Sequence, residues 1–366
     1  MGFNCGIVGL PNVGKSTLFN ALTATQAAEA SNFPFCTIEP NVGRVAVHHT
    51  RLYEIHRIAK SKTVVPAQIG FVDIAGLVKG ASKGEGLGNQ FLGHIREVDA
   101  IAHVVRCYES DGITHVEASI DPIRDAETVE TELLIADLES MERRIEPVAK
   151  KAAIGDKDAK QAMAVLEPVL AALHEGRPAR AATVPEGRDQ DVKALQLLTV
   201  KPVMYIANVE ESAAATGNEL SARLAEKAAA EGSECVVISA GIEAEIATLT
   251  DTDEALEFLE SLGLEEPGLD RVKQAGYDLL GLITFFTSGP NESRAWTVPR
   301  GITAARAAGK IHTDFERGFI RAETVSFDDF IDCGGEQGSR DAGKMRSEGK
   351  DYVIQDGDII LYRFNV

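Results

Sequence analysis

The chain has few of the features that stabilise secreted or membrane-bound proteins. Its five cysteines are odd in number and far apart, with no Cys-x-x-Cys pair, which argues against a disulfide framework and a zinc site. No apolar run approaches the length of a membrane span. The first apolar segment begins at Phe3, which leaves no room for a signal or transit peptide. We therefore expect a cytoplasmic protein without a membrane partner.

Positive charge is also scarce. The chain has 37 Lys and Arg against 56 Asp and Glu, a net charge of −19, so it will not coat nucleic acid nonspecifically. Any RNA contact must therefore use local basic patches, although for each individual residue a solvated charge on a helix face is the more common case. The candidates are Arg143, Arg144, Lys150, Lys151, Lys157, Lys160, Arg340, Lys344, Arg346 and Lys350.

Near its start the chain carries a phosphate-binding pattern. Residues 9–17 read Gly-Leu-Pro-Asn-Val-Gly-Lys-Ser-Thr, between an apolar strand at 3–8 and an apolar helix start at 18–22. Glycines let such a loop curl so that its N–H groups point at phosphate oxygens. Lys15 can then reach the β- and γ-phosphates, and the Ser16 hydroxyl can ligate Mg²⁺. The residues expected to hold the nucleotide here are Asn12, Val13, Gly14, Lys15, Ser16 and Thr17.

Two further positions are expected to respond to the γ-phosphate. A second apolar strand, 68–73, ends in Asp73-Ile74-Ala75-Gly76. A carboxylate at this place can hold a Mg²⁺-bound water, and the Gly76 N–H can contact the γ-phosphate. Thr37, in a loop between two prolines, is the expected second hydroxyl ligand of Mg²⁺.

Base recognition is expected after the strand 203–207, in the turn that begins Asn208-Val209-Glu210-Glu211. Guanine-specific relatives carry Asn-Lys-x-Asp here. Val209 in place of the lysine and Glu211 in place of the aspartate both weaken a guanine site, although neither creates an adenine site. The strand 236–240 contributes Ser239 and Ala240 to the same side.

The position that carries a water-orienting glutamine in many switch NTPases is Leu77. Leucine forms no side-chain hydrogen bond, so the water must be positioned by another group or hydrolysis is slow until a partner helps. His115 is the first candidate, ahead of His94 and His103. A second hypothesis is a K⁺ ion held with help from Asn12.

Outside these motifs the pattern changes twice. Asp121-Pro122 starts a helical stretch, and two apolar seams on either side of the turn Gly155-Asp156 indicate an antiparallel coiled-coil hairpin. The seam residues are Leu134, Leu138, Met141, Ile145, Val148, Met163, Leu166, Leu170 and Leu173. From about Leu282 short alternating strands follow, at 283–287, 295–298 and 359–364, which indicates an α+β module.

These motifs resemble the YchF/Obg-like ATPases, and residues 308–320 resemble that family's TGS domain. The resemblance runs end to end. It implies an α/β P-loop NTPase (Ras-like) domain at 1–120 and 198–281, an inserted antiparallel helical coiled-coil domain at 121–197, and a β-grasp (TGS) domain at 282–366. The family's catalytic histidine falls on His115, with Lys15 and Gly76 as further catalytic positions.

The resemblance further implies a preference for ATP, association with ribosomes, the large subunit and the 70S particle included, and a role in translation or stress response. The residues alone leave two alternatives open: a GTPase of the same class, and a binding module that uses ATP only as a ligand. Nothing in the sequence requires more than a monomer.

Overall fold

The computed structural model describes residues 3–30, 42–47, 49–74, 87–110, 119–249 and 251–365, and its chain forms two compact units. The first unit takes residues 3–43 and 70–276, and the second takes 44–69 and 277–366. Strands β2 (Val42–Val47) and β4 (Ala67–Asp73) contain the points where the chain passes between them. None of the described helices combines the length and apolar character needed to cross a bilayer.

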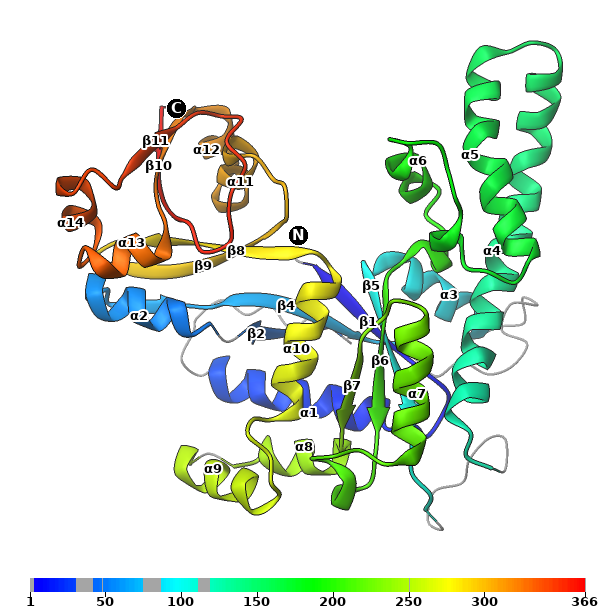
Figure 1. Cartoon of the computed structure of the whole chain (residues 1–366), viewed down its shortest axis with the longest axis horizontal. Helices are drawn as coiled ribbons and strands as arrows, with labels where there is room; N and C mark the ends of the chain where they lie inside the picture. Colours follow the sequence, from blue (N-terminus) through cyan, green and yellow to red (C-terminus); the bar gives the residue numbers. More distant parts are fainter. Residues whose placement is uncertain are drawn as a thin grey trace. The chain divides into compact units, whose positions relative to one another are not determined.

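A six-stranded sheet in the order β2-β4-β1-β5-β6-β7 is the centre of the first unit (Figure 1). Strands β1, β4, β5, β6 and β7 pair in parallel. Besides β2 and β4, the sheet contains β1 (Asn4–Val8), β5 (Ala100–Arg106), β6 (Val203–Asn208) and β7 (Cys235–Ile238). All seven residues of β5 and all six of β6 are buried, as expected for central strands covered by helices on both faces.

The helices of this unit lie between these strands in the chain or follow the last of them. They are α1 (Lys15–Ala30), α3 (Leu87–Glu97), α4 (Pro122–Ala153), α5 (Lys157–His174), α6 (Asp189–Ala194), α7 (Glu219–Ala230), α8 (Ala240–Ile246), α9 (Thr252–Ser261) and α10 (Gly268–Leu279), with short 3₁₀ turns η2 (Ala179–Ala181), η3 (Leu198–Val200) and η4 (Glu211–Ala213). Because parallel strands need such crossovers, the carboxyl ends of β1, β5, β6 and β7 meet at one edge of the sheet.

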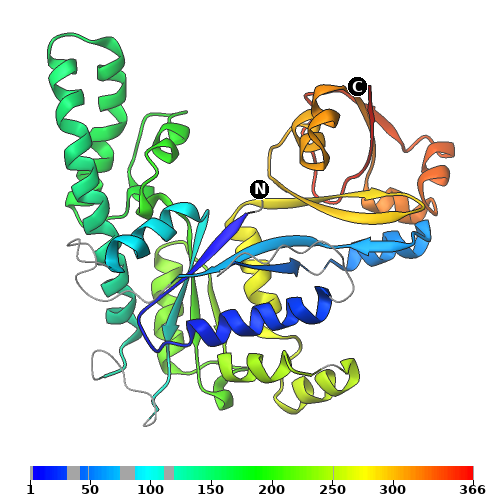
Figure 2. The ribbon, with the colours of Figure 1, turned by 180° about the vertical axis from the view of Figure 1, so that it is seen from behind.

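Helices α4 and α5 form the expected antiparallel hairpin, which extends away from the sheet (Figures 1 and 2). Asp121 caps α4, and its side chain accepts from the Ile123 N–H. The predicted seam residues all lie in one apolar cluster, which also includes Val165 and Val169. Buried Asp137 fixes the base of the hairpin, because it accepts from the N–H groups of Leu198 and Thr199.

The second unit has its own six-stranded sheet, in the order β11-β10-β12-β8-β9-β3. Its elements are α2 (Thr50–Ala59), β3 (Thr63–Val65), β8 (Leu282–Ser288), β9 (Glu292–Pro299), α11 (Ala304–Ile311), α12 (Thr313–Arg317), β10 (Phe319–Val325), α13 (Phe327–Asp332), α14 (Glu336–Asp341), β11 (Arg346–Glu348) and β12 (Ile359–Phe364). The strands expected at 283–287, 295–298 and 359–364 are β8, β9 and β12, and no end differs by more than three residues.

One segment of the second unit comes from early in the chain. Strand β3 pairs in parallel with β9, and Leu52 and Ile55 of α2 are buried in the same cluster as Phe286 and Phe330. No periodicity in the sequence indicates this long-range pairing. The expected α/β fold with an inserted helical hairpin and a C-terminal domain is confirmed, whereas the domain boundaries proposed from the sequence remain predictions.

Candidate functional site

The loop between β1 and α1 is held in a strained, specific shape. Asn12 has φ 62° and Gly14 has φ 99°, both in the left-handed region that favours glycine. A Cβ on Gly14 would lie 2.4 Å from Nδ2 of Asn208, and one on Gly9 would lie 2.3 Å from the carbonyl oxygen of Val104. The two glycines of the motif are therefore required by close contacts as well as by backbone conformation.

Lys15, the first residue of α1, lies inside this loop. Its side chain is only 7% exposed, and its Nζ donates to the carbonyl oxygen of Leu10 at 2.7 Å. Burial lowers the pKa of Lys15 to about 8, although the nearby Asp73 carboxylate opposes the shift. Burial likewise raises the pKa of Asp73, against the Lys15 ammonium. The Lys15 ammonium and the Asp73 carboxylate therefore lie in the same partly desolvated environment, close to the carboxyl ends of the neighbouring strands β1 and β4.

Asn208 at the end of β6 joins this loop to the predicted base-binding segments. Its Nδ2 donates to the carbonyl oxygen of Val13 at 2.9 Å, and its Oδ1 accepts from the Ala240 N–H at 2.9 Å. The side chain is 3% exposed, so both bonds lie where water cannot replace them. One amide thus fixes the distance between the phosphate loop and the start of α8.

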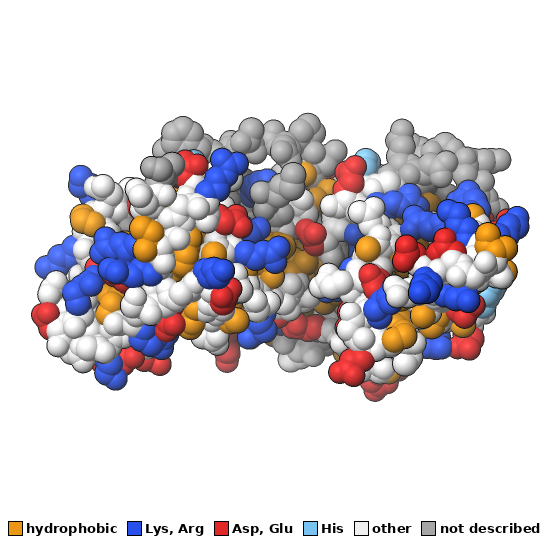
Figure 3. Space-filling model, turned by 90° about the horizontal axis from the view of Figure 1, so that it is seen from above, with side chains coloured by type: hydrophobic (Ala, Val, Ile, Leu, Met, Phe, Trp, Pro, Cys, Tyr) orange, Lys and Arg blue, Asp and Glu red, His pale blue; other side chains and the backbone are white. Residues whose placement is uncertain are grey.

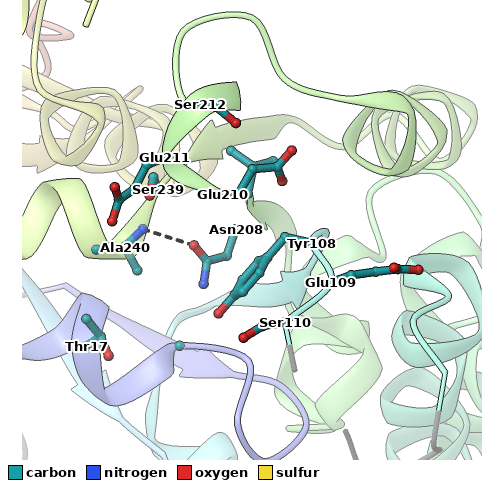
Figure 4. Close-up of a pocket in the computed structure, with 13 residues that line it drawn as sticks. Thr17, Tyr108, Glu109, Ser110, Asn208, Glu210, Glu211, Ser212, Ser239 and Ala240 are labelled. Atoms are coloured by element: carbon teal, nitrogen blue, oxygen red, sulfur yellow. Dashed lines mark hydrogen bonds between the residues drawn. The ribbon is translucent and has the colours of Figure 1, made fainter. Parts of the chain in front are cut away.

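A pocket of about 570 Å³ opens in front of Asn208. Figure 4 shows Tyr108 and Ser110 on one side of Asn208, with Glu211, Ser239 and Ala240 on the other. The residues that line the pocket are Gly14, Thr17, Tyr108, Glu109, Ser110, Asn208, Val209, Glu210, Glu211, Ser212, Ser239, Ala240 and Gly241. The predicted base-side residues and Gly14 and Thr17 of the phosphate loop therefore surround one space.

The loop after β5 is a part of the pocket that sequence reasoning missed. Arg106 is 1% exposed, and it donates to the carbonyl oxygens of Tyr108 and Ser110 while its guanidinium lies 4.6 Å from the Tyr108 ring centre. Asn218 donates to the carbonyl oxygen of Cys107 at 2.7 Å and to Glu210 at 2.8 Å. The place of this loop in the sequence could have indicated its role, because it follows the carboxyl end of a buried parallel strand.

The structure describes some of the other predicted site residues and not the rest. Ser16 and Thr17 are exposed on the first turn of α1, and Asp73 is half-buried at the end of β4. Val209 is 2% exposed at the pocket wall, and Glu211 is exposed. Thr37, Gly76, Leu77 and His115 lie outside the described residues. Among the residues that are described, no group of three or more His, Cys, Asp or Glu side chains could hold a metal ion.

Two histidines considered for water positioning lie away from this pocket. His103 is 2% exposed within β5 and stacks against Tyr205 with ring centres 5.5 Å apart. Burial lowers the pKa of His103 to about 3, so the ring is neutral and packs in the core. His94 is exposed on α3 and does not line the pocket.

Comparisons with known proteins agree with this geometry. The model of a 50S ribosome-binding GTPase family matches residues 4–137, and the YchF-GTPase C-terminal family, described as a protein of unknown function, matches 282–365. Proteins called ribosome-binding ATPase YchF are similar over the full length of both chains, with 57% identity over 366 residues in Escherichia coli O157:H7 and 53% over 368 residues in Bacillus subtilis.

A solved structure extends the similarity to the fold. The structure of the Schizosaccharomyces pombe YchF GTPase is 37% identical, with a TM-score of 0.89, and the match covers 99% of this chain and 98% of that one. Sequence and structure therefore agree over both units, and the chain belongs to the YchF family of P-loop NTPases.

Proposed function

We propose that this protein is an ATPase that binds and slowly hydrolyses ATP with Mg²⁺, and acts as a nucleotide-dependent switch on the ribosome. The observation that carries the proposal is the double contact of Asn208, which makes the phosphate loop and the base-side pocket one continuous site. The relatives named ribosome-binding ATPase supply the partner. The switch would act on the large subunit and the 70S particle, in translation or in the response to stress.

The described residues suit a Mg²⁺-bound triphosphate. Lys15 would move its ammonium from the Leu10 carbonyl to the β- and γ-phosphates, whose charge would compensate its burial. The Ser16 hydroxyl and the Asp73 carboxylate, directly or through water, are oxygen ligands of the kind that Mg²⁺ takes. Mg²⁺ would neutralise charge on the β- and γ-phosphates. Thr37 would add a second hydroxyl, and the Gly76 N–H would contact the γ-phosphate.

Two residues on the base side weaken a guanine site, which supports the proposed preference for ATP. Val209 is an apolar wall residue at the position where guanine-specific relatives carry lysine, and Glu211 is one methylene longer than their aspartate. Tyr108, held by Arg106, offers an aromatic face that does not discriminate between purines. A GTPase of the same class is the second candidate, because both the matching 50S ribosome-binding model and the fission yeast structure carry GTPase in their names.

Hydrolysis is proposed to depend on His115, since Leu77 cannot orient water. The His115→Ala variant should bind ATP with unchanged affinity while phosphate release falls about a hundredfold, the range of one positioned acid–base group. The matched control is His94→Ala, an exposed histidine outside the pocket. Equal turnover of the His115 variant and the wild type would remove His115 from the mechanism. Loss of turnover when Na⁺ replaces K⁺ would support a K⁺ ion near Asn12.

The low pKa of Lys15 predicts a pH dependence of binding. The ammonium must be charged to hold phosphate, and its pKa in the free protein is about 8. Affinity for Mg·ATP should therefore change little from about pH 6.5 to 7.5 and fall above pH 8, approaching tenfold per pH unit, as proton uptake on binding rises from near zero toward one. Calorimetry in buffers of different ionisation enthalpy measures this uptake. Lys15→Arg, which stays charged, should show no such fall.

We infer that the C-terminal unit is a TGS module and that the protein is a cytoplasmic monomer.

Two of the basic side chains considered for RNA contact in the C-terminal unit are neutralised by acidic neighbours. Lys344 pairs with Asp329 at 3.0 Å, and Arg346 pairs with Glu348 at 3.2 Å. Lys344 and Arg346 are therefore poor candidates for a ribosomal contact.

A further inference from the structure

Three arginines converge on one buried carboxylate in the second unit. Glu323 of β10 is 6% exposed. Its Oε1 accepts from Arg321 at 2.9 Å, and its Oε2 accepts from Arg340 of α14 at 3.1 Å and from Arg363 of β12 at 3.0 Å. Arg321, Arg340 and Arg363 are here called the arginine trio.

The trio carries more positive charge than Glu323 needs. A carboxylate is satisfied by one bidentate guanidinium, yet three are present, and Glu336 adds only one further carboxylate, 3.0 Å from Arg340. Three positive charges thus face two negative ones. Arg321 and Arg363 are also direct cross-strand partners, an arrangement of like charges that weakens a sheet unless a group such as Glu323 offsets it.

The arginine side chains remain accessible although their positions are fixed. The exposed fractions of the side chains are 51% for Arg321, 40% for Arg340 and 46% for Arg363, against 7% for the side chain of Glu323. Each guanidinium has five N–H donors, and the bonds to Glu323 use two on Arg321 and one on each of the others. The carboxylate therefore orients the three guanidiniums while most of their donors remain available to a ligand.

We propose that the arginine trio is a docking site for the phosphodiester groups of RNA. This inference rests on the proposed ribosome function and assigns it a contact. In a chain of net charge −19, a polyanion can approach only where positive charge is locally in excess. Lys and Arg side chains are numerous on the face of the second unit seen in Figure 3, where Asp and Glu side chains also lie. Guanidinium forks match phosphate geometry, and the repeating charge of one RNA strand can meet all three arginines.

The test is the salt dependence of binding by the full chain, measured with two probes: a labelled 20-base-pair RNA duplex and purified large ribosomal subunits. Single variants Arg321→Gln, Arg340→Gln and Arg363→Gln should each weaken binding about threefold to tenfold and reduce the slope of log affinity against log salt by about one. The matched control is Lys344→Gln, which removes a charge that Asp329 balances, and it should change affinity less than twofold.

Folding is controlled separately, because each Gln variant removes a partner of Glu323. Arg363→Lys keeps the charge and can keep the contact with Glu323 but loses the planar fork, so it should retain the salt slope while losing part of the affinity. Unfolding midpoints of all variants are measured alongside. A variant that loses RNA binding at an unchanged midpoint supports the docking site.

The outcomes separate this inference from the proposed function. If the trio variants match Lys344→Gln on both probes, the docking site is overturned, and ribosome binding by the wild type would still stand. If the trio controls duplex binding but the wild type does not bind ribosomes, the docking site stands and the ribosome proposal fails. If the variants weaken ribosome binding without trio-dependent RNA binding, the partner is a ribosomal protein and the RNA assignment is wrong.

Discussion

Replacing Lys15 by alanine is expected to lower the affinity for nucleoside triphosphate by at least about a hundredfold and to remove measurable turnover, since it deletes a charge-assisted contact to the phosphates. The side chain is 7% exposed inside the loop. Other groups therefore have little room to take its place. Binding of a fluorescent ATP analogue, together with phosphate release, measures both effects.

The same substitution should leave the fold intact. Burial lowers the pKa of Lys15 to about 8, which means that its charged form is less favourable in the folded chain than in the unfolded one. Lys15→Ala should therefore keep or raise the unfolding midpoint at pH 7. Lys193→Ala, an exposed lysine of α6, is the matched control and should change neither property. Undiminished ATP affinity in the Lys15 variant would contradict the assignment of this loop.

The second large effect concerns the choice of base. The double variant Val209→Lys, Glu211→Asp rebuilds the Asn-Lys-x-Asp pattern beside Asn208, so the carboxylate can accept from two N–H groups of guanine. Hydrogen bonds to a charged group contribute about 1.5–3 kcal/mol each, so the ratio of GTP to ATP affinity should rise at least about tenfold. Val209 lines the pocket, where the lysine stem can lie along the base.

Competitive binding of ATP and GTP to the nucleotide-free double variant measures this ratio. Glu219→Asp shortens an exposed acidic side chain of α7 that does not line the pocket, and it should leave the ratio unchanged. If the double variant kept the preference of the wild type, the turn after β6 would not be the segment that selects the base.

The parts of the fold that depend on local pattern could be predicted from the sequence. Asp121-Pro122 marked the start of α4, and helical spacing marked the apolar seams of α4 and α5. The phosphate loop was recognised from its glycines, at positions where the structure has no room for a side chain. These features are set by residues close together in the chain, so a single sequence contains them.

Features built from distant residues could not be predicted in this way. The pairing of β3 with β9 joins Thr63 to Glu292, and the Glu323 cluster joins strand residues to Arg340 and Arg363. The contact of Arg106 with Tyr108 is short in sequence, but it depends on the burial of Arg106 between strands. Hydrophobic periodicity does not record which surfaces meet, so these contacts needed the structure.

The proposed ATPase switch is best tested by titrating ATP and GTP against the nucleotide-free protein, with and without large ribosomal subunits, while binding and phosphate release are followed together. We expect tighter binding of ATP than of GTP, and slow phosphate release that the subunits accelerate. Equal or tighter binding of GTP would contradict the proposed base preference. ATP binding without phosphate release, even with ribosomal subunits present, would contradict the proposed ATPase and indicate a module that uses ATP only as a ligand.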